Sequence, residues 1–112
     1  MATTPAKITI GNDVAVAVQL KRNELPFVIP GTATVKAVLT TLDKKYQLSS
    51  IVTCAELESG ADWSTSLVVA VFSSAVTALI EYTGMAYIEV QVTDAGKTTF
   101  TADVEILAAS IP

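Results

Sequence analysis

The stretch from Gly60 to Ile80 constrains the fold more than any other part of this sequence. Its middle, Leu67–Phe72, is apolar at every position, whereas a strand with one face in water would alternate apolar and polar residues. We therefore expect a strand that is covered from both sides. Trp63, the only tryptophan, comes just before this strand, where an aromatic side chain can close the end of a core.

A change of period follows this strand. Val76, Leu79 and Ile80 have the spacing of one face of a short helical turn. Ser73 or Ser74 is suited to cap that turn, because a serine hydroxyl accepts a hydrogen bond from the first free N–H groups. We expect the turn to connect two strands.

Alternation of apolar and polar residues predicts the other strands, which are separated by turns. They cover Lys7–Ile10, Val14–Leu20, Thr32–Thr41, Tyr46–Glu56, Met85–Thr93 and Lys97–Leu107. The pattern breaks at Ser49 and Ser50, which predicts a bulge or two shorter strands there. Gly96 is expected to supply a left-handed residue to the last hairpin.

The segment from Leu25 to Gly31 is apolar but contains two prolines. Because proline cannot donate to a strand ladder, we expect an edge or a loop laid over the core. The whole chain, residues 1–112, has the length of one domain. Short strands with turns every eight to twelve residues or so are typical of a β-sandwich.

The composition leaves few charges for the surface. Charged residues make up 16% of the chain, against about 25% in an average domain. Either Ala and Thr fill the surface, or other subunits cover part of it. The net charge of −4 argues against a nucleic-acid partner, because no basic cluster exceeds Lys21-Arg22 or Lys44-Lys45. No apolar run has the length of a membrane span, and we expect no secretory signal.

The sequence contains no histidine, which excludes Ser-His-Asp and Cys-His catalysis and an imidazole metal site. We interpret Cys54 as a small buried hydrophobe. One acidic cluster could serve as a glycosidase pair or a calcium site, but a solvated loop is the simpler interpretation: it comprises Glu56, Glu58 and Asp62. Trp63, Tyr82 and Tyr87 could form a sugar-stacking platform, although Trp63 has the position of a core residue. We expect no enzyme activity, no cofactor and no metal.

Several segments together resemble the N-terminal domain of tailed-phage baseplate upper proteins. These segments are Ile8–Asp13, Val18–Leu20, Ala33–Ala37, Gly60–Trp63, Val69–Phe72, Thr77–Ala78 and Ile88–Val92. The resemblance covers nearly the whole chain through short, mostly apolar motifs. It implies a domain that anchors a longer receptor-binding or fibre-bearing chain in the virion. The fold class implied is all-β, an immunoglobulin-like β-sandwich of about seven to eight strands with one short helical crossover.

Two features depart from that family. Its members usually continue into a helical stalk and a distal domain, whereas this sequence stops at Pro112, and Glu24-Leu25-Pro26 replaces a Gly-x-Pro turn. We therefore expect a non-enzymatic structural protein of a tailed-phage virion, either a decoration or cement subunit or an adaptor. The alternative is a carbohydrate-binding β-sandwich that acts in host attachment.

The expected partners are major capsid, neck or baseplate subunits, together with other copies of the chain on the particle. We expect no nucleic-acid or membrane partner, and location in the virion after synthesis in the bacterial cytoplasm. The predicted contact residues lie in an N-terminal arm, a proline-flanked loop and a C-terminal tail. They are Thr3, Thr4, Pro5, Leu25, Phe27, Ile29, Ala108, Ile111 and Pro112. The alternative for these residues is frayed ends and a loop that merely covers the core.

Overall fold

The computed structural model describes residues 6–22, 24–43, 46–56, 60–94 and 96–109. Nine strands and two short helical turns lie in this described part of the chain. The strands are β1 (Ala6–Thr9), β2 (Val14–Gln19), β3 (Lys21–Arg22), β4 (Leu25–Pro26), β5 (Thr34–Thr40), β6 (Val52–Cys54), β7 (Leu67–Phe72), β8 (Gly84–Thr93) and β9 (Lys97–Leu107). The helical turns are η2 (Trp63–Thr65), of the 3-10 type, and α1 (Ser74–Thr77).

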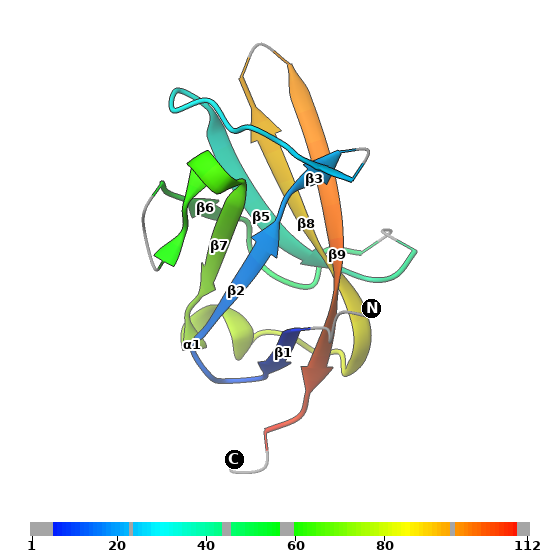
Figure 1. Cartoon of the computed structure of the whole chain (residues 1–112). Coiled ribbons are helices and arrows are strands. Elements are labelled where there is room, and N and C mark those ends of the chain that lie inside the picture. The colour runs from blue at the N-terminus through cyan, green and yellow to red at the C-terminus, as the bar shows by residue number, and fades with distance from the viewer. Residues whose placement is uncertain (1–5, 23, 44–45, 57–59, 95, 110–112) are drawn as a thin grey trace.

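The strands form two layers that face each other (Figure 1). The large sheet has the order β1-β9-β8-β5-β6, the small sheet joins β2 to β7, and β3 and β4 form a short hairpin. The described pairs are antiparallel, except that β1 runs parallel to β9. The fold is an all-β, immunoglobulin-like sandwich, and α1 connects β7 in one layer with β8 in the other. The prediction of fold class is thus confirmed, with two-residue strands β3 and β4 added.

The core lies between the two sheets and consists of alternate residues from each strand. On the small sheet, Val16 and Val18 of β2 lie opposite Ala70 and Val68 of β7. The large sheet contributes the buried residues Ile8, Val35, Ala37, Leu39, Ala86, Ile88, Val90, Val92, Val104 and Ile106. Alternation in the sequence predicts all of these positions except Ile8 and Ala86 to face the core. It also predicts Phe100 and Ala102 there, and these two residues are half-buried. Cys54 is also buried, as predicted.

A tight loop fixes Trp63 at the start of β7. The Asp62 carboxylate accepts hydrogen bonds from the N–H and the hydroxyl of Ser64, at 3.1 and 2.6 Å, and so caps η2. The main chains of Asp62 and Leu67 then exchange two hydrogen bonds of 3.0 and 2.9 Å. Trp63 is 4% exposed and belongs to the core cluster, which confirms its predicted role.

The crossover turn is held by a residue that the sequence pattern does not single out. The buried Thr77 hydroxyl donates to the C=O of Asn12 at 2.8 Å and accepts from the N–H of Gly11 at 3.1 Å. Asp13, rather than Ser73 or Ser74, caps the turn, because its carboxylate accepts a hydrogen bond from the N–H of Ser74. Both contacts tie α1 to the turn between β1 and β2.

Three local expectations are wrong. Leu79 is 74% exposed, because α1 ends at Thr77 and the helical spacing that would turn Leu79 toward the core does not extend that far. Val71 is 42% exposed, so β7 is not covered on both faces along its whole length. Gly96 does not have a positive φ, although the predicted hairpin does connect β8 and β9. The predicted break in the strand near Ser49 is present, because only an isolated bridge at Gln47 precedes it and strand β6 begins after it. The Ser49 hydroxyl accepts a hydrogen bond from the N–H of Leu39.

Candidate docking surfaces

The segment from Leu25 to Pro30, which begins with β4, divides its side chains between core and solvent. Leu25 and Val28 are exposed, and Phe27 is half-buried. The N–H of Phe27 donates a hydrogen bond of 3.0 Å to the C=O of Leu20. The Phe27 ring also packs edge-on against the Phe100 ring, with 5.0 Å between the ring centroids. Ile29 is 5% exposed and belongs to the core. This segment thus covers the core through Ile29 and leaves Leu25 and Val28 exposed.

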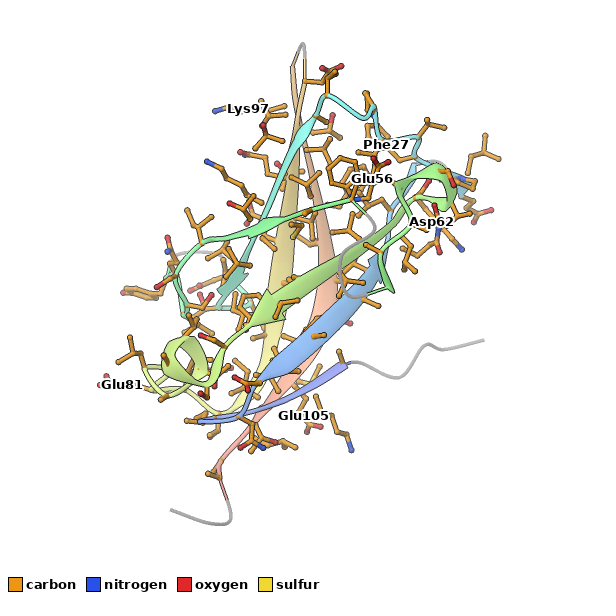
Figure 2. The ribbon with its side chains drawn as sticks, turned by 90° about the vertical axis from the view of Figure 1, so that its left-hand side faces the viewer. Phe27, Glu56, Asp62, Glu81, Lys97 and Glu105 are labelled. Carbon is orange, nitrogen blue, oxygen red and sulfur yellow. The ribbon has the colours of Figure 1, made fainter. Side chains whose placement is uncertain are left out.

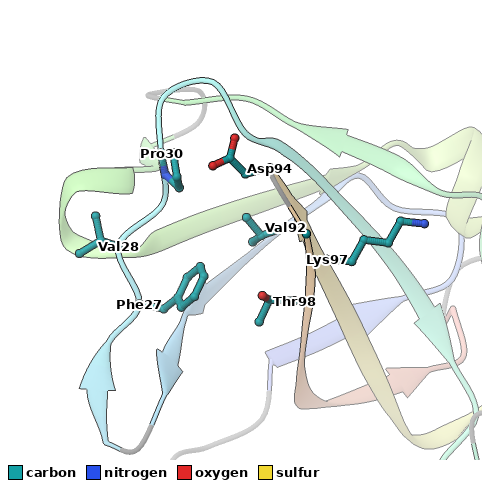
Figure 3. A pocket seen from close by; sticks show the side chains of 8 residues that line it. Phe27, Val28, Pro30, Val92, Asp94, Lys97 and Thr98 are labelled. Atoms are coloured by element: carbon teal, nitrogen blue, oxygen red, sulfur yellow. The ribbon is translucent and has the colours of Figure 1, made fainter.

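A groove of about 260 Å³ lies between this segment and the β8–β9 hairpin (Figure 3). Phe27, Val28 and Pro30 form one wall, and the other comes from the hairpin, through Val92, Asp94, Gly96, Lys97 and Thr98. Apolar and polar residues thus both line the groove, with Asp94 and Lys97 as its charged members. Alternation in the sequence identified Val92 as core, but no local signal indicated that the hairpin would lie beside the loop.

The outer face of the small sheet is a second candidate surface. Strand register places Ala15 beside Val71 and Ala17 beside Val69 on this face, opposite the core-facing side chains. Ala15, Ala17 and Val71 are exposed, whereas Val69 is buried. Neither Val14–Leu20 nor Trp63–Ile80 contains a charged residue. This part of the surface is therefore apolar and uncharged.

The third candidate surface is a hollow of about 150 Å³ on the outer face of the large sheet. It is lined by Lys36, Ala37, Val38, Ile51, Glu89 and Gln91. Three of these residues are apolar and three are polar or charged. It is smaller than the groove and lies on a face whose chemistry suits contact with water.

The structure describes only one of the predicted contact residues near the two ends of the chain. Ala108 is exposed just after β9, whereas Thr3, Thr4, Pro5, Ile111 and Pro112 lie outside the described residues. The structure thus brings together one predicted contact region, the loop around Phe27, with the β8–β9 hairpin that the prediction did not include.

The structure describes only two members of the predicted acidic cluster. Glu56 and Asp62 lie toward the same end of the molecule as Phe27 (Figure 2), and Glu58 is outside the described residues. Asp62 already serves as the cap of η2. In the described part of the chain, no group of three or more His, Cys, Asp or Glu side chains is arranged to hold a metal ion. Nor does any helix there have the length and apolarity needed to cross a membrane.

The three aromatic residues do not form a common platform. Trp63 is buried. Tyr82 lies just before β8 and is half-buried, and its hydroxyl donates a hydrogen bond of 2.7 Å to the C=O of Met85. Tyr87 lies farther along β8, opposite Thr40 of β5 and Asp103 of β9. A sugar ring cannot stack on all three residues at once, because Trp63 is buried in the core.

The sequence matches no model of a known protein family and no curated protein. Its fold is similar to part of a crystal structure of a candidate glycoside hydrolase from Bacteroides vulgatus ATCC 8482. The TM-score is 0.53 at 8% sequence identity, and the match covers 95% of this chain but 17% of that chain. At this identity the likeness shows a shared fold alone.

Proposed function

We propose that this chain is a non-enzymatic structural module of a tailed-bacteriophage virion, a decoration, cement or adaptor subunit that docks on other virion proteins. The observation that carries the proposal is the uncharged outer face of the small sheet, with Ala15, Ala17 and Val71 exposed. Soluble proteins that present an apolar sheet face usually cover it with a partner. Leu25 and Val28 add apolar surface on the neighbouring loop.

The family resemblance supports the same proposal from a different direction. It implies an immunoglobulin-like sandwich whose task is docking within the particle, and the chain has an immunoglobulin-like sandwich fold. The proposed partners are capsid, neck or baseplate subunits, and further copies of the chain on the particle. Docking needs only surfaces of matching shape and chemistry, so it is compatible with a chain that has no histidine.

The test is to locate the protein in purified virions, by quantitative mass spectrometry and then by cryo-EM. Hundreds of copies on the shell would identify a capsid decoration, and a few to a few tens of copies at the tail end would identify an adaptor. Absence from the particle would refute the proposal. Light scattering on the purified protein adds a second readout, because strictly monomeric behaviour would argue against self-association.

Carbohydrate binding is the second candidate. A protein with a similar fold is described as a candidate glycoside hydrolase, and the groove is lined by Phe27 together with the polar residues Asp94 and Thr98. Sugars bind in proteins through an exposed ring face together with hydrogen-bonding side chains. Phe27 is half-buried and Trp63 is buried, which leaves this candidate less support. Binding on a glycan array that is lost in a Phe27→Ala variant would favour it.

A further inference from the structure

Strand β9 has a neighbour on its outer side along only part of its length. β1 pairs with Val104–Leu107, whereas β8 pairs with β9 from Lys97 to Ile106. From Lys97 to Asp103, no strand in the described part of the chain pairs with the side of β9 that faces away from β8. Figure 1 shows this upper, orange part of β9 at the margin of the large sheet.

Two hydrogen bonds establish which main-chain groups face this open edge. On the β1 side the C=O of Leu107 accepts from the N–H of Ile10, and the C=O of Gly96 accepts from Asp94 in the hairpin with β8, each at 3.0 Å. Because the N–H and C=O groups of successive strand residues point to alternate sides, odd-numbered residues of β9 face away from β8. Thr99 and Thr101 therefore present their N–H and C=O groups at the open edge.

The core-facing side chains of β9 are also buried to different degrees along the strand. Val104 and Ile106, where β1 lies alongside, are 0% and 1% exposed. Phe100 and Ala102, on the same face of the same strand, are only half-buried. The burial of β9 is thus complete where a neighbouring strand is present and incomplete where none is described.

The groove continues this open edge. Lys97 and Thr98 of β9 line it, and Phe27 on its opposite wall contacts the Phe100 ring of β9. Lys97 and Asp103 are both exposed and stand on the outward face at the two ends of the open edge. Main-chain groups, apolar surface and two opposite charges therefore lie along one line.

We propose that β9 between Lys97 and Asp103 binds an extended segment of a partner protein, which joins the large sheet as an added strand. The segment continues the pairing that β1 begins, and alternate apolar side chains cover Phe100 and Ala102 and enter the groove. Charge complementarity calls for an acidic residue opposite Lys97 and a basic residue opposite Asp103. This inference rests on the proposed docking function and names the chemistry of the partner.

The test uses the isolated full chain and two end-blocked peptides as probes, Glu-Val-Thr-Val-Thr-Val-Lys and Lys-Val-Thr-Val-Thr-Val-Glu. They place the same charges opposite Lys97 and Asp103 in parallel and antiparallel addition, respectively. Amide hydrogen exchange is followed residue by residue by NMR. We expect one peptide to slow exchange at Thr99 and Thr101 by about tenfold or more, while the β8-facing amides of Phe100 and Ala102 change little.

Thr101→Pro removes an N–H at the open edge without removing a bond to β8, and should abolish this protection. Thr101→Val keeps the N–H and should retain it. If Thr101→Pro does not fold, Lys97→Glu gives a second test, with an expected loss of affinity of about two- to fivefold. These experiments need no virion, so they can fail while the particle location still supports the proposed function.

Two results would overturn the inference. One is that neither peptide protects Thr99 and Thr101. The other is that these amides are already protected in the free chain and become exchangeable only when residues 1–5 are deleted. That outcome would assign the edge to the chain's own N-terminal residues.

Discussion

The outer face of the large sheet and the outer face of the small sheet have opposite chemistry. Register aligns the outward residues of the large sheet in rows, with Lys36, Gln91 and Thr99 in one row and Val38, Glu89 and Thr101 in the next. The corresponding rows of the small sheet are Ala15 with Val71, Ala17 with Val69, and Gln19 with Leu67. Polar or charged side chains thus predominate on the large sheet, with Val38 as the exception in these rows. Apolar side chains predominate on the small sheet, with Gln19 as the exception.

This difference cannot come from the core, because both sheets contribute fully buried side chains to it. An antiparallel sheet with one face in water normally carries polar residues on that face. The large sheet follows this rule and the small sheet does not. We infer that contact with water shaped the first face and contact with another protein shaped the second.

The largest predicted effect tests whether the inner faces are equivalent. Phe72→Ala on the small sheet should lower the free energy of unfolding by about 3–5 kcal/mol, because it removes a fully buried ring and leaves a cavity. Ile88→Ala on the large sheet should cost about 2–5 kcal/mol. Denaturant unfolding followed by the fluorescence of Trp63 measures both. A cost below about 1 kcal/mol for Phe72→Ala would mean that the small sheet is not a full partner in the core.

The next effect concerns the connection between the layers. Thr77→Val keeps the side-chain shape but leaves the N–H of Gly11 and the C=O of Asn12 without their hydroxyl partner. We expect a loss of about 1–3 kcal/mol in the free energy of unfolding. Thr77→Ser, which keeps the hydroxyl, is the matched control and should lose less. Equal losses in the two variants would show that the methyl group contributes as much as the hydrogen bonds.

A smaller effect is expected at the start of α1. Asp13→Ala removes the acceptor for the N–H of Ser74 and should lower the free energy of unfolding by about 1 kcal/mol. Asp13→Asn retains a side-chain oxygen and should remain close to the wild-type value. Thermal and denaturant unfolding measure both variants. If Asp13→Asn loses as much as Asp13→Ala, the charge of Asp13, rather than its geometry, stabilises the turn.

The sequence pattern predicted the core well, and the reason is local. Alternation shows which side chains of a strand share a face, and the predicted bounds Lys97–Leu107 coincide with β9. It also placed Val35, Ala37 and Leu39 in the core. The errors at Leu79 and Gly96 are local as well, since each depends on where one helical or hairpin turn ends.

The candidate docking surfaces could not be predicted in the same way. They depend on which strands become neighbours, and that is decided by contacts between distant residues. The loop around Phe27 was identified from its prolines, but its partner in the groove, the β8–β9 hairpin, lies far along the chain. The open edge of β9 exists because β1 pairs with Val104–Leu107 and no farther. No alternation pattern contains that information.

The smallest effect on stability tests the comparison of the two outer faces most directly. Val71→Lys on the small sheet should change the free energy of unfolding by no more than about 0.5 kcal/mol, because the side chain is already exposed. Val38→Lys makes the same replacement on the large sheet, where the new lysine can pair with the carboxylate of the neighbouring Glu89. Incorporation of the two variants into virions, measured by mass spectrometry, is the readout.

We expect Val71→Lys to be lost from particles, because a buried and unpaired lysine opposes docking, and Val38→Lys to be incorporated normally. Equal incorporation of both folded variants would mean that the alanine and valine face stays in contact with water. If only Val38→Lys is missing from virions, the interface lies on the large sheet and the comparison of the two outer faces is reversed. Because neither variant is expected to unfold the domain, a difference between them reports on the contact surface rather than on stability.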